Sequence, residues 1–152
     1  MEIIPFTDEL ANDFSRLNLA WVEKYFEVEK PDREMLGDPR QNIIDKGGHI
    51  FFVRSGGTIA GTFALLKNSD TEYELSKMAV SEEHQGQKIG NRMLEFCIEK
   101  AKALQAIRII LYSNTMLLPA IHLYKKYGFV EVPNNNSEYK RSNIKMALEL
   151  IK

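Results

Sequence analysis

The segment from Tyr73 to Tyr112 constrains the fold of this chain more than any other part of the sequence. It holds a strand-like run at Tyr73 to Val80, an amphipathic helix from about Gly90 to Leu104, and a β-branched run at Ile107 to Tyr112. A strand, a helix and a buried strand in this order form a right-handed parallel crossover, because only that hand packs the helix back onto the sheet. The sequence therefore predicts one parallel strand pair covered by a helix.

The remaining strand-like runs predict antiparallel pairing. Ile50 to Val53 and Ile59 to Leu66 flank the turn Ser55-Gly56-Gly57-Thr58, which is typical of a hairpin. Further strands are expected at Glu2 to Pro5, Phe129 to Val132 and Ile144 to Leu150, with a loop at residues 133–136. The predicted fold class is α/β (α+β), a mixed, mostly antiparallel sheet with a central parallel β-α-β unit, flanked by helices.

Helices are also predicted outside the crossover. A second one begins at Pro31, is interrupted near Gly37-Asp38-Pro39 and resumes to Asp45. A short one at Pro119 to Tyr127 ends at Gly128, since glycine readily takes the left-handed conformation that terminates helices. The first helix of the chain is expected from about Asp8 to Tyr25. Its predicted buried face holds Leu10, Phe14, Leu17, Trp21 and Tyr25.

Length and composition favour one soluble domain that binds a small molecule. The 152 residues are 44% hydrophobic, enough for one buried core, and we expect a single domain over residues 1–152. Twenty basic and 21 acidic residues leave a net charge of -1, which argues against nucleic acid or an anionic membrane as partner. The single cysteine, Cys97, excludes an internal disulfide and is predicted to be a core residue.

No targeting or membrane segment is expected. Residues Met1 to Pro5 show no basic region leading into an apolar stretch, and no apolar run is long enough to span a bilayer. These features predict a cytoplasmic protein with no membrane contact, while both a monomer and a homodimer stay open.

The turn between the predicted strand and helix is a candidate phosphate site. It reads Gln85-Gly86-Gln87-Lys88-Ile89-Gly90. The first N–H groups of a helix have no partner within the helix and carry the positive end of its dipole, so small residues there let phosphate oxygens approach. Glycines also occur where a turn needs them for structure alone, and this alternative stays open. Two rival phosphate motifs are absent, Gly-Lys-Ser/Thr and an early Gly-x-Gly-x-x-Gly.

Three blocks of the sequence together resemble the GNAT superfamily of N-acetyltransferases, over about Ile50 to Leu150. Gln85 and Gly90 match the ends of its pyrophosphate pattern, Gln/Arg-x-x-Gly-x-Gly/Ala. Lys88 stands where that pattern has glycine, and a side chain takes a positive φ less readily than glycine does. Glu74 to Val80 is similar to the family's central strand. The run from Ala120 to Phe129, with its Gly-Phe end, is similar to the family's last block.

The resemblance implies an acyl-CoA N-acyltransferase fold and acetyl-CoA (coenzyme A) as cofactor. Many members carry an asparagine where this chain has Leu117, so Asn114 is a weaker candidate for a cofactor contact. The implied cofactor-binding residues are Met78, Ala79, Val80, Gln85, Gly86, Gln87, Lys88, Ile89, Gly90, Asn91, Asn114, Pro119, Ala120 and Tyr124.

By the same resemblance, Tyr124 and Glu74 are the candidate catalytic residues. Tyr124 matches the tyrosine that reaches the cofactor sulfur, and a phenol suits protonation of a thiolate. Glu74 matches a strand glutamate that some members use as general base. The main-chain N–H of Met78 or Ala79 is the expected oxyanion donor. The alternatives are that Tyr124 only packs and that Glu74 is an exposed strand carboxylate.

The acceptor is expected to be an amine of a small molecule, an amino acid or a peptide. In this fold the first helices and the last hairpin wall off the acceptor side, which nominates Trp21, Tyr25, Glu29, Asp32, Tyr139 and Arg141. The three histidines, His49, His84 and His122, lack metal-ligand spacing, so no metal is expected.

Three classes of function can be compared with these sequence features. The leading one is an N-acetyltransferase, because Tyr124 accompanies the glycine turn. A non-catalytic acyl-CoA-binding or sensing module is the alternative, which Lys88 keeps open. A structural interaction domain does not explain why the three blocks occur together.

Overall fold

The structure, a computed structural model, describes residues 1–134 and 139–150. In these residues the strands form one sheet of seven, in the order β1-β2-β3-β4-β5-β7-β6. The strands are β1 (Glu2–Pro5), β2 (His49–Ser55), β3 (Thr58–Lys67), β4 (Glu72–Val80), β5 (Arg108–Ser113), β6 (Val130–Val132) and β7 (Ile144–Glu149). The helices are α1 (Ala11–Tyr25), α2 (Lys30–Gly37), α3 (Ile89–Ala103) and α4 (Leu118–Lys126). Short 3-10 turns lie at η1 (Asp8–Leu10) and η3 (Glu82–His84), and a π-helical turn at η2 (Arg40–Ile44).

The predicted fold class is confirmed. Strands β4 and β5 pair in parallel with α3 as their crossover, and every other neighbouring pair in the sheet is antiparallel. The hairpin of β2 and β3 turns at Gly56 and Gly57, whose φ angles are 58° and 81°. Two successive positive φ values suit the right-handed twist of the flanking strands, and glycine adopts them without a Cβ clash.

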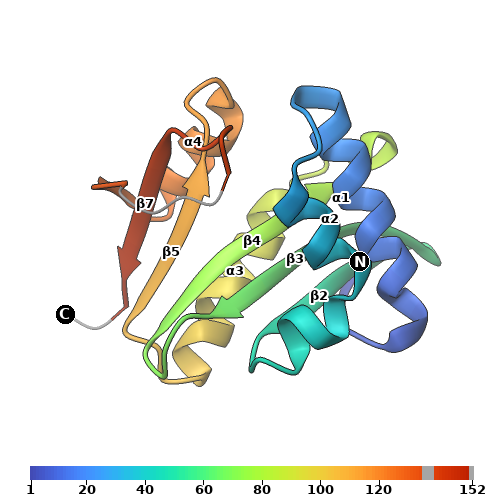
Figure 1. Ribbon diagram of the computed structural model, residues 1–152, viewed down its shortest axis with the longest axis horizontal. Helices are drawn as coiled ribbons and strands as arrows, with labels where there is room; N and C mark the ends of the chain where they lie inside the picture. The colour runs from blue at the N-terminus through green and yellow to red at the C-terminus, as the bar shows by residue number, and fades with distance from the viewer. Residues whose placement is uncertain (135–138, 151–152) are drawn as a thin grey trace.

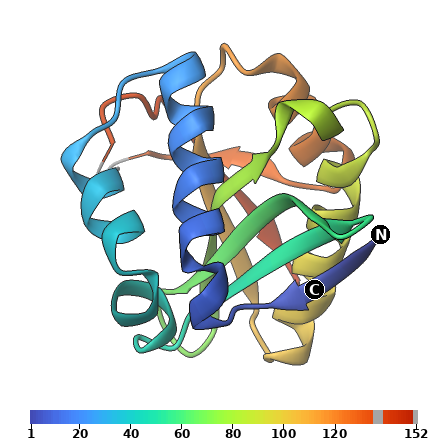
Figure 2. The same ribbon diagram turned by 90° about the vertical axis from the view of Figure 1, so that its right-hand side faces the viewer.

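The sheet carries helices on both faces. Helix α3 covers one face and helices α1 and α2 the other (Figure 1), a division that the side view also shows (Figure 2). On the α3 side the core gathers Phe63, Met93, Cys97 and Ile109, while Phe14, Leu36, Phe52 and Ala64 fill the α1 and α2 side. Each of these larger side chains contributes about 1.5–3 kcal/mol by leaving water. The sheet thus has a core on each face, and β4 is the central strand in its order of seven.

One part of the helix prediction is wrong. The buried residues of α1 are Phe14, Leu17, Asn18 and Val22, whereas Tyr25 is 41% exposed. The buried face is therefore turned away from the expected stripe at its C-terminal end. Asn18 can lie inside because its side-chain amide donates to the carbonyl oxygen of Phe14 at 2.9 Å, which replaces its bonds to water.

The other predicted elements are present, with ends that differ by a few residues. Pro31 lies in the first turn of α2, and Gly128 follows α4 with a φ of 98°. The predicted loop at residues 133–136 lies partly outside the described residues. Among the helices in the described ranges, none combines the length and the apolar character that crossing a membrane requires.

Candidate active site

The parallel strands β4 and β5 separate along their length. They pair only from Glu72 to Glu74 with Arg108 to Ile110. Beyond these residues β4 stays paired with β3 up to Val80, and β5 stays paired with β7 up to Ser113 (Figure 1). A cavity of about 240 Å³ opens where they part, and we call it the cleft. The sheet is thus open at its centre, where main-chain groups of β4 lack a partner strand on that side.

A β-bulge reorients β4 inside the cleft. Thr62 of β3 pairs with Ala79 and Ala64 pairs with Ser76, so Lys77 and Met78 stand opposite one residue. Lys77 has a φ of 54°, which L residues rarely adopt. Before the bulge Tyr73 and Leu75 pack into the α3-side core, and after it Met78 and Val80 pack against that core. The extra residue has therefore switched the alternation, and the Lys77 side chain lies on the other face.

Residues from six segments of the chain line the cleft. Helix α1 and the residue after it provide Asn18, Trp21, Val22 and Phe26. The centre is lined by Glu74 to Val80 and by Tyr112 to Asn114, and the far side by Leu117, Ala120 and Tyr124. The remaining lining residues are Gln85, Tyr139, Arg141 and Ser142. Both candidate catalytic residues and Met78, Ala79, Val80, Asn114 and Ala120 are thus brought together, whereas Pro119 and Tyr25 are outside this lining.

The residues Gln85 to Asn91, the glycine turn, lead from β4 into α3 and border a hollow of their own. The hollow is lined by Val80, His84, Gln85, Gly86, Lys88, Ile89, Gly90 and Asn91, without Gln87. The side chain of Ile89 is buried in the core, so this residue offers only its main chain. Val80 and Gln85 also line the cleft, so the hollow and the cleft adjoin at these two residues.

Lys88 does take the conformation that a side chain disfavours. Its φ and ψ are 60° and 27°, directly before the first residue of α3, and Gly86 has a φ of 84°. The departure from glycine therefore leaves the left-handed turn in place. At Gly90 an added Cβ would lie 3.2 Å from the Leu123 side chain and 3.6 Å from that of Met78, so a glycine lets α3 pack closely on α4 and β4.

Tyr124 reaches the cleft from α4. Its ring packs against Phe129 with a centroid distance of 6.0 Å. Burial raises the pKa of the Tyr124 hydroxyl to about 12, so the phenol keeps its proton at neutral pH. Cys97 lies in the core with its thiol pKa also raised to about 12 by burial, which removes it as a nucleophile. The Tyr124 phenol is therefore a group in the cleft that carries a proton at neutral pH.

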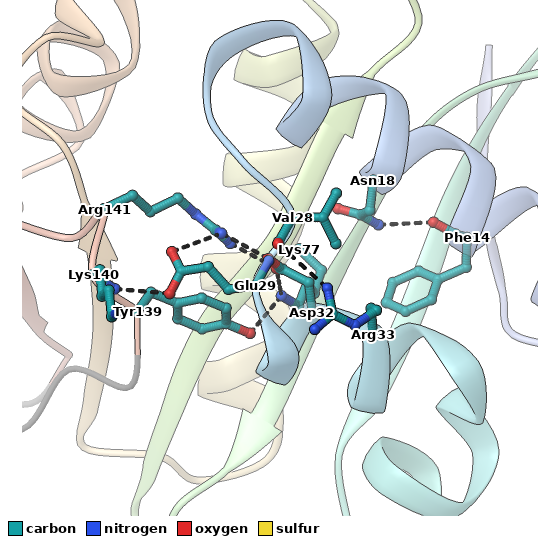
Figure 3. A network of polar contacts seen from close by, with 10 residues as sticks. All are labelled: Phe14, Asn18, Val28, Glu29, Asp32, Arg33, Lys77, Tyr139, Lys140 and Arg141. Atoms are coloured by element: carbon teal, nitrogen blue, oxygen red, sulfur yellow. Dashed lines mark hydrogen bonds and ion pairs between the residues drawn. The ribbon is translucent and has the colours of Figure 1, made fainter.

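Five charged or polar residues form a network beside the cleft, with two buried side chains and three half-buried ones, which we call the Asp32 cluster (Figure 3). Its members are Glu29, Asp32, Lys77, Tyr139 and Arg141. The Asp32 carboxylate is 0% exposed and accepts two bonds from the Arg141 guanidinium, each at 2.7 Å. It also accepts a hydrogen bond from the Lys77 ammonium at 3.0 Å and one from the main-chain N–H of Glu29 at 2.9 Å. The cluster joins α2, the bulge of β4 and the segment before β7.

Burial and pairing oppose each other in the Asp32 cluster. Burial alone raises the pKa of the Asp32 carboxyl, but the bonds from Arg141 and the Glu29 N–H and the charge of Lys77 outweigh it, and that pKa is about 2. At Lys77 burial prevails, and the pKa of the ammonium is lowered despite the nearby Asp32. The carboxylate is therefore well compensated, and the lysine is the costly member of the pair.

Several predicted acceptor residues have internal partners. Glu29 accepts the main-chain N–H of Lys140 at 3.0 Å and pairs with Arg141 at 3.4 Å. Asn114, a predicted cofactor contact, donates to the main-chain carbonyl of Arg141 at 2.7 Å. Trp21 lines the cleft directly. Asn114 and Glu29 therefore hold the segment around Arg141 in position from two sides.

The sequence does not predict several residues of the site, among them Lys77, Tyr112 and His84. Lys77 interrupts the alternation of Tyr73, Leu75 and Ala79, and a lysine at a core-facing position signals a bulge. Tyr112 ends a run that predicts only a buried strand. His84 borders the glycine turn, with its Nδ1 2.6 Å from the Ser81 hydroxyl. No periodic signal in the sequence separates the last two residues from ordinary packing residues.

Sequence comparisons agree with this geometry. The model of the Acetyltransferase (GNAT) family matches residues 12–129. The chain is 32% identical over 101 residues to the uncharacterized N-acetyltransferase YvbK of Bacillus subtilis (strain 168), covering 64% of this chain and 65% of that protein. It is 25% identical over 116 residues to N-acetyltransferase family 8 member 2 of Rattus norvegicus, covering 73% and 51%. The chain thus matches 51% to 65% of the length of these relatives.

Solved structures share the fold at low sequence identity. A GNAT-family acetyltransferase of Staphylococcus aureus Mu50 superposes with a TM-score of 0.86 at 20% identity, covering 99% of each chain. An aminoglycoside 6'-N-acetyltransferase complexed with coenzyme A superposes with a TM-score of 0.71 at 17% identity, covering 100% of this chain and 98% of that one. At these identities the likeness establishes the architecture.

Proposed function

Because this chain belongs to the GNAT family of acetyltransferases, we propose that it transfers an acetyl group from acetyl-CoA to a primary amine of a small molecule, an amino acid or a peptide. One observation carries the proposal. The parting of β4 from β5 beyond Glu74 opens a cleft that adjoins, at Val80 and Gln85, the hollow at the glycine turn. An extended thioester with a diphosphate at its far end suits such a path.

The glycine turn fits the diphosphate. The first N–H groups of α3 have no partner within the helix, and the turn before them is held open by Gly86 and Lys88 at positive φ. In the proposed mode of binding, the main chain from Gly86 to Asn91 binds the phosphate oxygens and the Lys88 ammonium adds a positive charge beside them. Met78, Ala79 and Val80 offer main-chain groups to the pantetheine arm along the open side of β4.

The cleft residues then have three tasks. Acetyl-CoA supplies an activated thioester, whose carbonyl carbon the amine attacks. Glu74 accepts the proton of the incoming ammonium, directly or through water, and the main-chain N–H of Met78 or Ala79 stabilises the oxyanion. Tyr124 keeps its proton at neutral pH, because burial raises its pKa to about 12, and donates that proton as negative charge develops on the departing sulfur.

Thiol release from acetyl-CoA in the presence of an amine panel tests the proposal. Tyr124→Phe removes the proton donor and is expected to lower turnover about 10²-fold with unchanged acetyl-CoA affinity. Tyr73→Phe is the matched control, because Tyr73 lies in the α3-side core and its hydroxyl is outside the cleft lining. Equal turnover in wild type and Tyr124→Phe would remove the acid role. Stabilisation by acetyl-CoA without thiol release for any amine would instead identify a sensing module.

A further inference from the structure

A second cavity lies next to the cleft, on the α1 and α2 side of the sheet. It has a volume of about 310 Å³ and is bounded by Met35 of α2, Ile43 of η2 and Leu66 of β3, and we call it the side cavity. Four residues line both the side cavity and the cleft: Glu74, Ser76, Tyr112 and Tyr139. These four residues therefore form the boundary between the two spaces.

The side cavity lies where an acceptor must approach. The glycine turn adjoins the cleft at Val80 and Gln85, at the end of β4, whereas the side cavity adjoins it at Glu74, near the start of that strand. If the acyl donor occupies the first end, the second end is the one that leads to the candidate general base. An amine that passes the shared boundary arrives beside the Glu74 carboxylate.

Tyr139 is held firmly in this boundary by the Asp32 cluster (Figure 3). Its hydroxyl accepts a hydrogen bond from the Lys77 ammonium at 2.6 Å. Its ring faces two cations, the Arg141 guanidinium at 4.3 Å from the centroid and the Lys77 ammonium at 4.5 Å. Arg141 is itself fixed by two bonds to Asp32. The ring position is thus set by residues of α2 and β4, although Tyr139 belongs to the segment before β7.

From this arrangement, we propose that Tyr139 determines which acceptors reach the thioester and that Lys77 is the residue that positions it. The inference rests on the proposed function, since it assigns the side cavity to the amine of that reaction. The ring of Tyr139 lines both the side cavity and the cleft, so it lies at the boundary that an acceptor would cross. Lys77, held in the left-handed conformation by the bulge, brings its ammonium to the hydroxyl of that ring.

The test compares two isomeric primary amines, one linear and one branched next to the nitrogen, with acetyl-CoA as donor. Tyr139→Ala removes the ring and is expected to shift the ratio of kcat/KM toward the branched isomer by at least tenfold. Tyr139→Phe keeps the ring and is expected to leave that ratio within twofold while raising the acceptor KM severalfold. Lys77→Met is expected to raise the acceptor KM further. In all three variants the dissociation constant of acetyl-CoA should stay within twofold of wild type.

Lys102→Met is the matched control for Lys77→Met, because the Lys102 side chain is 52% exposed on the far end of α3. An unchanged isomer ratio in Tyr139→Ala would overturn the role of the ring. If Lys77→Met and Tyr139→Phe weaken acetyl-CoA binding as much as they raise the acceptor KM, the positioning role is overturned, since a general structural defect affects both substrates. If Lys77→Met does not fold, the acceptor KM of Tyr139→Phe, which loses the hydroxyl that Lys77 binds, tests the positioning role instead. Should the wild type bind acetyl-CoA but transfer to neither isomer nor to any other amine, the proposed function itself fails.

Discussion

The two ends of the candidate active site offer different kinds of chemical group, main-chain groups at one end and charged side chains at the other. The glycine turn offers main-chain groups at the start of α3, and its side chains leave the space open. The Asp32 cluster offers side-chain charges that are paired with one another and are buried at Asp32 and Lys77. In the proposed function the glycine turn binds the diphosphate, which is common to every acyl-CoA, so main-chain groups suffice for it. An acceptor differs between enzymes, and side chains are the part of a protein that substitution changes most easily.

Two lysines show the same contrast within one strand-turn-helix segment. Lys77 and Lys88 have nearly equal φ angles, 54° and 60°. The Lys77 side chain is 5% exposed and held by Asp32, whereas Lys88 is exposed beside the turn hollow. A left-handed side chain costs about 1–3 kcal/mol. At Lys77 the bonds of its buried ammonium to Asp32 and Tyr139 hold this conformation in place. Lys88 takes it in an exposed turn, directly before the first residue of α3.

The largest predicted effect comes from breaking the Asp32 cluster. Asp32→Asn leaves the Lys77 ammonium and the Arg141 guanidinium without their carboxylate in a buried site. We expect the free energy of unfolding to fall by about 3–5 kcal/mol, measured by chemical denaturation. Asp13→Asn, which breaks the exposed pair with Arg16, should cost at most about 1 kcal/mol. Similar losses in both variants would show that the cluster is no more than a surface ion pair.

Acid should weaken the same cluster with a defined midpoint. The folded pKa of Asp32 is about 2, below its ordinary value of 3.8, so the folded state binds this proton less readily. The resulting stability is complete above the ordinary value and is lost as pH falls through about 2. Between pH 5 and pH 2 the wild type should lose about 2 kcal/mol more than Asp32→Asn does. Parallel pH profiles of the two proteins would contradict this assignment.

The sequence predicts the glycine-turn end of the site better than the end at the Asp32 cluster. The glycine turn was predicted from Gln85, Gly86 and Gly90, because a strand-turn-helix signal is local in the chain. The Asp32 cluster joins residues more than 40 positions apart, such as Asp32 and Lys77, and composition gives no sign of that contact. Four of the five members of the cluster, Glu29, Asp32, Tyr139 and Arg141, are among the predicted acceptor residues, but the sequence does not predict their bonds to one another.

The error on α1 has a similar physical origin. A stripe at Leu10, Phe14, Leu17, Trp21 and Tyr25 satisfies the helical period, and so does the observed face through Phe14, Asn18 and Val22. Hydrophobicity favoured the first, because an asparagine costs free energy when buried without a partner. The bond from Asn18 to the Phe14 carbonyl removes that cost. Trp21 is thereby left to line the cleft instead of the core.

At the opposite end of the site, an acidic side chain should act on the donor alone. Gly90→Asp places a carboxylate in the first turn of α3 and is expected to weaken acetyl-CoA binding at least tenfold, measured by calorimetry. Gly90→Ala adds the Cβ near Leu123 without charge, and thus separates crowding from repulsion. Undiminished affinity in Gly90→Asp would place the diphosphate somewhere other than the glycine turn.

The smallest effect sharpens the contrast between the two lysines. Lys88→Gly relieves the left-handed strain and should raise the free energy of unfolding by at most about 1 kcal/mol. Lys77→Gly relieves the same strain but removes a buried partner of Asp32, so it should lower that free energy. Thermal unfolding of the two variants side by side gives the signs. Stabilisation in both would mean that the Lys77 side chain contributes nothing to folding.

The most direct test of this account is a crystal structure of the protein grown with coenzyme A. The account predicts the diphosphate within hydrogen-bond distance of the main-chain N–H groups between Gly86 and Asn91, and the pantetheine arm between β4 and β5 beyond Glu74. A diphosphate bound elsewhere, or a pantetheine arm outside the parted strands, would contradict it.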